Sequence, residues 1–196
     1  SGDRRSELVF MVLAKGLSLS ASAYMHMPDK SGPVHYAMSN ALDFFLLPYN
    51  GGSILAVATP RSWLRLRLLH AAVIVGSSLA VVQPVFRWTI CASTGDVKGA
   101  ARPHSQRTTI TTLTGAWVLL SWLVQAGLQV TWLGYTVSLI VGYVFYSRQY
   151  QGKPPMPWHG RIWGAHDDFH VFGILADVFA FAYAIPAATA MVAATT

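Results

Sequence analysis

Two histidines stand four residues apart near the carboxyl end of the chain, in the segment WGAHDDFHVF at 163–172. On a helix, His166 and His170 would share one face, because residues i and i+4 are neighbours on a helix surface. Imidazole nitrogen is a common ligand of Zn²⁺, so a pair with this spacing can hold one ion. A tetrahedral ion needs further ligands, which must come from other segments of the chain.

The chain that must position these histidines is apolar. Of its 196 residues, 53% are hydrophobic and 11% are charged, whereas a soluble domain has about 25% charged residues. This composition predicts an integral membrane protein. The net charge of +6 does not indicate a nucleic-acid partner, because the basic residues are scattered between hydrophobic runs. A single cysteine, Cys91, excludes an internal disulfide and a cysteine zinc cage.

Six apolar segments have about the 20 residues that a membrane-spanning helix needs. They cover roughly 8–27, 34–58, 66–86, 109–127, 130–147 and 165–192. Two longer polar connections, 87–109 and 147–163, separate the third segment from the fourth and the fifth from the sixth. The sequence therefore predicts an all-α, multi-pass bundle of six transmembrane helices, with residues 1–196 forming one domain.

The helix order brings the polar residues to one side of the membrane. We call the side at which the first segment ends face X, and the opposite side face Y. Because successive spans alternate in direction, the second and sixth segments both begin at face X. His26, Asp43, His166 and His170 are therefore expected at a similar depth near face X, and Ser22 lies one helical turn from His26.

This set of residues suggests catalytic zinc chemistry. Three imidazoles leave a fourth tetrahedral position for water, as in catalytic zinc sites, and zinc lowers the pKa of such a water to about 7. Asp43 would hold or deprotonate the water. Ser22 would donate a hydrogen bond to the site or to a developing oxyanion.

Loop charges indicate the orientation. Face X carries Lys30, Arg87, Lys98, Arg102, Arg107, Arg148, Lys153 and Arg161, and face Y carries Arg4, Arg5, Arg61, Arg65 and Arg67. Eight basic residues against five make face X the cytoplasmic, matrix or stromal side by the positive-inside rule.

Three stretches resemble the progestin and adipoQ receptor/haemolysin III family, part of a superfamily of membrane hydrolases that includes alkaline ceramidases. They are SAYMH at 22–26, ALDFFLLPYNGGSI at 41–54 and the segment 146–179, which contains HDDFHVF. The similarity extends over nearly the whole chain and is most specific in the last stretch.

The resemblance implies that His26, His166 and His170 bind zinc, that Asp43 holds the water on the zinc and that Ser22 lines the site. It also implies a cavity open to membrane lipids and hydrolysis of a ceramide-like lipid amide.

The sequence departs from the family pattern in three ways. The family has seven helices, and its first, with a Glu-x-x-Asn-x-x-x-His pattern, has no counterpart here, so the chain is either part of a longer protein or a member that lacks this helix. Asp167 and Asp168 stand between the two histidines, where the helix macrodipole favours carboxylates near the amino terminus. Asp177 lies two turns beyond His170 and is expected to point into the bundle, hydrogen-bonded or protonated.

Two other classes of function remain open. A non-catalytic member would keep the fold as an accessory subunit or receptor, with partner membrane subunits covering the face of the absent helix. Haem binding would need His26 as the partner ligand, because His166 and His170 share one helix face and do not reach opposite sides of one porphyrin.

Overall fold

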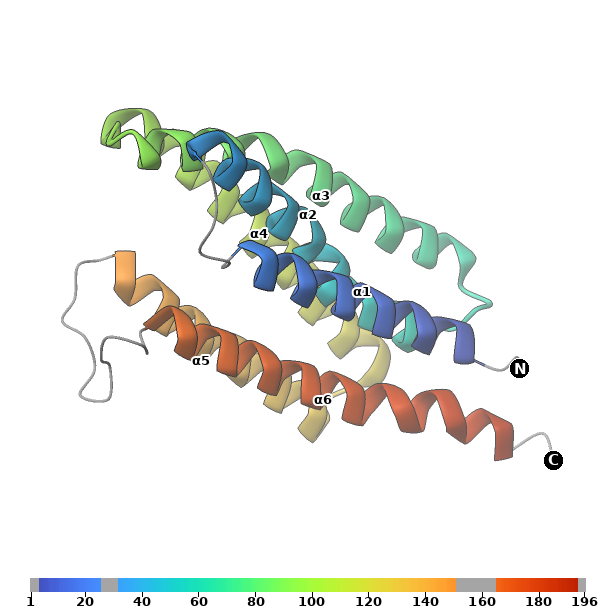
Figure 1. The fold of residues 1–196 in the computed structure, drawn as a ribbon. Helices are drawn as coiled ribbons and strands as arrows, with labels where there is room; N and C mark the ends of the chain where they lie inside the picture. Colours follow the sequence, from blue (N-terminus) through green and yellow to red (C-terminus); the bar gives the residue numbers. More distant parts are fainter. Residues whose placement is uncertain (1–3, 26–31, 151–164, 194–196) are drawn as a thin grey trace.

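The computed structural model describes residues 4–25, 32–150 and 165–193, and the side chains of 4–25, 32–146 and 168–189. This part of the chain contains helices and no strand. The helices are α1 (Arg5–Met25), α2 (Pro33–Ala58), α3 (Leu64–Ser93), α4 (Val97–Ala126), α5 (Val130–Tyr150) and α6 (Ala165–Ala193). They lie side by side and alternate in direction (Figure 1), as the sequence predicts.

The bundle is that of a multi-pass integral membrane protein. Five helices are long and apolar enough to cross a membrane: α1 to α4, and α6 over Asp168–Thr189. In α5 the apolar part with described side chains is shorter, Val130–Tyr146. Large apolar side chains such as Leu79, Leu113 and Leu120 point outward and are more than 60% exposed. Such continuous apolar surface is costly in water and suits contact with lipid.

The third and fourth helices are longer than their apolar segments predict. The polar connection expected at 87–109 is almost entirely helical, and only the turn at residues 94–96 separates α3 from α4. Asp96 caps α4 by accepting a hydrogen bond from the Gly99 amide at 2.8 Å. Each helix has 30 residues and is therefore about 45 Å long, against about 30 Å for the hydrocarbon core.

Small residues let α5 and α6 pack closely. Gly134, Ser138 and Gly142 recur every fourth residue along α5, so they share one face of the helix. A methyl group at Gly134 would lie 2.5 Å from the ring of Phe179 on α6, and one at Gly142 would lie 3.0 Å from Cβ of Phe172. Contacts of this type drive helix association in lipid, where apolar surface alone gives little preference for protein.

Gly134→Ala is expected to destabilise the bundle by about 1–3 kcal/mol, because the new methyl group overpacks the ring of Phe179. Thermal unfolding in detergent would show a lower midpoint. The matched control is Gly173→Ala on α6, where a methyl group meets no atom within 4 Å. Equal midpoints for the two variants would contradict the close α5–α6 contact.

Candidate functional site

Three of the predicted site residues, Ser22, Asp43 and His170, lie on helices that pack against one another. Helices α1, α2 and α6 make contacts in all three pairings. The carboxyl end of α1 and the amino ends of α2 and α6 lie at the same end of the bundle (Figure 1). The expectation that the helix order brings these segments to face X is confirmed.

The structure describes part of the predicted residue set. Ser22, Asp43 and His170 are half-buried. His26 lies outside the described residues, and His166 belongs to α6, but its side chain lies outside the described part. Among the described side chains, no three His, Cys, Asp or Glu groups form a metal site, and that set excludes two of the three predicted ligands.

A buried polar group fixes which faces of the three helices point inward. Lys15 on α1 donates a hydrogen bond to Oδ1 of Asn50 on α2 at 2.8 Å and forms an ion pair with Asp177 on α6. Side-chain exposure is 3% for Lys15 and 15% for Asp177. We call these three residues the interhelix triad. The prediction that Asp177 points into the bundle is confirmed.

The predicted site residues lie on the same helix faces as the triad. Seven residues are close to two helical turns and advance the chain by about 10 Å. Moving seven residues toward face X leads from Lys15 to Ser22 on α1, from Asn50 to Asp43 on α2 and from Asp177 to His170 on α6.

By helical spacing, Ser22, Asp43 and His170 continue toward face X the sides of α1, α2 and α6 that carry the triad. The same spacing argument extends to the backbone position of His166, which is eleven residues, or about three turns, from Asp177.

Arg107 is a buried cation near this end that the sequence analysis placed in a loop. It lies in α4, is 2% exposed, and its guanidinium carbon is 3.7 Å from the centre of the Trp88 ring. This distance is typical of a cation–π contact. Its Nη1 donates to the hydroxyl of Tyr146 at 3.3 Å, and Nη2 lies 3.0 Å from Nδ1 of His104.

Ring contacts connect Arg107 to the predicted site. Its guanidinium is 5.2 Å from the ring of Phe44, the residue after Asp43. The ring of Tyr146 is 5.2 Å from that of Phe169, the residue before His170. A positive charge thus lies beside the helix segments that carry Asp43 and His170. The sequence analysis assigned residues 87–109 to a polar connection, whereas α4 begins at Val97 and carries Arg107 on a helix.

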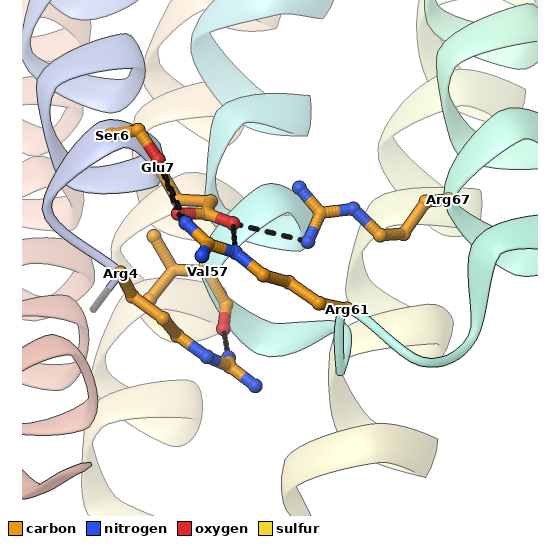
Figure 2. Close-up of polar contacts among 6 residues, drawn as sticks. All are labelled: Arg4, Ser6, Glu7, Val57, Arg61 and Arg67. Carbon is orange, nitrogen blue, oxygen red and sulfur yellow. Dashed lines mark hydrogen bonds and ion pairs between the residues drawn. The ribbon is translucent and has the colours of Figure 1, made fainter. Parts of the chain in front are cut away.

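A second polar cluster lies at face Y, at the opposite end of α1 from Ser22, and Figure 2 shows its contacts. Glu7 on α1 is 5% exposed and accepts two hydrogen bonds from Arg61 at 2.6 Å, and one from Arg67 on α3 at 3.1 Å. Arg4 donates to the backbone carbonyl of Val57. These contacts tie the start of α1 to the end of α2 and the start of α3, which gives the cluster a structural role.

His70 is a buried residue of α3 whose ring contacts side chains of α4. It is 5% exposed, and its Nδ1 accepts a hydrogen bond from the indole of Trp117 at 3.2 Å. Its Nε2 lies 3.0 Å from the amide nitrogen of Gln125. Both ring nitrogens are therefore in contact with side chains of α4.

Comparison of the chain with protein-family models, with curated proteins and with solved structures gave no match. The class of protein defined by the fold is a multi-pass helical membrane protein.

Proposed function

We propose that this protein is a zinc-dependent membrane hydrolase that cleaves a ceramide-like lipid amide at face X, as its resemblance to the haemolysin III family implies. In this proposal His26, His166 and His170 hold the metal. The observation that supports it is the interhelix triad, because the faces of α1, α2 and α6 that meet there also carry Ser22, Asp43 and His170.

The residues available suit the metal. A set of three neutral imidazoles is a donor set that zinc accepts in catalytic sites. When bound, zinc supplies a Lewis acid that makes water a nucleophile near neutral pH. The apolar outer surface of the bundle gives a lipid substrate direct access from the bilayer.

Side chains of the protein carry out the proton transfers and stabilise the developing negative charge. Asp43 is the general base: its carboxylate orients the attacking water, accepts its proton and returns a proton to the leaving amine. Ser22 donates a hydrogen bond to the carbonyl oxygen as negative charge develops there. Arg107 is a fixed cation beside both helices and stabilises negative charge at this end of the bundle.

Fatty-acid release from ceramide in mixed micelles tests the proposal. The wild-type chain is expected to release fatty acid, and Asp43→Ala is expected to lower the rate by about 10²–10⁴-fold, the usual effect of losing a general acid–base group. Asp96→Asn is the matched control, since it removes an exposed carboxylate from the same end of the bundle and keeps a side-chain oxygen that can cap α4.

Two results would contradict the proposal that the protein is a hydrolase with Asp43 as its general base. If the wild-type protein carries one zinc ion but releases no fatty acid, it is a non-catalytic member that serves as a subunit of a membrane complex. If Asp43→Ala and Asp96→Asn have equal activity, Asp43 is not the base.

A further inference from the structure

We propose that the arginine cluster at face Y binds the phosphodiester headgroup of an anionic phospholipid. The cluster comprises Arg61 and Arg67, which donate hydrogen bonds to Glu7, and Arg4, which donates to the carbonyl of Val57 (Figure 2). This site is independent of the proposed zinc centre, which lies at the opposite end of the bundle.

The charge at face Y favours an anionic ligand. The described residues at this end carry five positive charges and one negative charge, a net charge of +4. The positive residues are Arg4, Arg5, Arg61, Arg65 and Arg67, and the negative residue is Glu7. Glu7 already accepts hydrogen bonds from Arg61, Arg67 and Ser6. The protein thus neutralises one of the positive charges through its own carboxylate.

Donors of two arginines are available to a ligand. A guanidinium has five N–H donors. Within the described part of the chain, Arg67 gives one hydrogen bond, to Glu7, and Arg4 gives one, to the carbonyl of Val57. The side chain of Arg67 is 27% exposed and that of Arg61 is 43% exposed, so the cluster is accessible from outside the bundle.

The neighbouring residues place the cluster at the membrane surface. Trp63 is 52% exposed and Leu64 is 62% exposed, and both lie between Arg61 and Arg67 in the sequence. Tryptophan prefers the level of the lipid headgroups, whereas leucine at this exposure suits the acyl chains below. A lipid phosphate at that level meets guanidinium groups, which bind phosphate oxygens through paired hydrogen bonds.

Native mass spectrometry of the full chain from mixed micelles tests this site. With equal amounts of phosphatidylglycerol and phosphatidylcholine, the wild-type protein is expected to retain phosphatidylglycerol preferentially. Each lost arginine should weaken retention by about fivefold, so Arg4→Gln/Arg67→Gln should lower it by about 25-fold. The matched control, Arg87→Gln/Arg102→Gln, removes two exposed arginines near face X and should retain the lipid.

Because Arg67 also contacts Glu7, Arg67→Lys provides a variant that keeps the charge and can keep one hydrogen bond. It should unfold at the wild-type temperature and retain the lipid less well than the wild type but better than Arg67→Gln, since lysine keeps the charge but does not form the paired contact. Equal retention of both lipids by the wild-type protein would overturn the proposal, and so would equal losses in the face Y and face X variants. Displacement of the lipid by inorganic phosphate at the same concentration would assign the site to a free anion and overturn the lipid assignment.

Discussion

Purified wild-type protein is expected to contain one zinc ion per chain, and His170→Ala is expected to contain almost none. A catalytic zinc site has three protein ligands, and two imidazoles do not hold the ion against dialysis in the presence of a weak chelator. The loss should be at least 100-fold in affinity. Elemental analysis of the dialysed protein, together with its concentration, gives the stoichiometry.

The control for this experiment is His35→Ala. His35 on α2 is exposed and contacts the hydroxyl of Tyr24 at 2.9 Å, so its loss should leave the zinc content unchanged. Full zinc content in His170→Ala, or equal loss in both variants, would contradict the proposed ligand set. An intense Soret absorption in the purified protein would instead support haem.

Lys15→Met is expected to destabilise the bundle by about 3–5 kcal/mol, because it leaves the carboxylate of Asp177 inside the bundle without its partner charge. Chemical unfolding in detergent micelles, followed by circular dichroism, measures the change. The double variant Lys15→Met/Asp177→Leu should recover much of the loss, since replacing both charges by apolar groups of similar size removes the unpaired group.

The matched control is Lys98→Met, which removes an exposed lysine in the first turn of α4. It should unfold as the wild type does. If Lys15→Met also unfolds as the wild type does, or if the double variant is less stable than both single variants, the triad does not hold the three helices together.

The helices and their direction could be predicted from hydropathy, because each span needs a continuous apolar run. The end of α3 and the start of α4 could not, since α3 continues through polar residues after residue 86, and α4 begins among polar residues and includes Pro103. A helix outside the apolar run is stabilised by packing against its neighbour, and one sequence does not reveal that contact. His104 and Arg107 were therefore assigned to a loop.

The positions of three candidate site residues along the bundle could be predicted. Spacing and helix order brought Ser22, Asp43 and His170 to one end of three packed helices. The partner of Asp177 was not predicted, because Lys15 lies 162 residues away in the sequence, and nothing local to either residue indicates that the two meet. The ligand set itself stays a prediction.

Because Lys15 and Asp177 are far apart in the sequence, α1 is synthesised long before the partner of its lysine. Ribosomes add about 5–20 residues per second, so the 162 residues between Lys15 and Asp177 take about 8–32 s to synthesise. During that time α1 already carries its lysine. Asn50, only 35 residues later, is the partner that emerges first, and α1 and α2 can therefore insert as a hairpin that shelters the lysine until the last helix arrives.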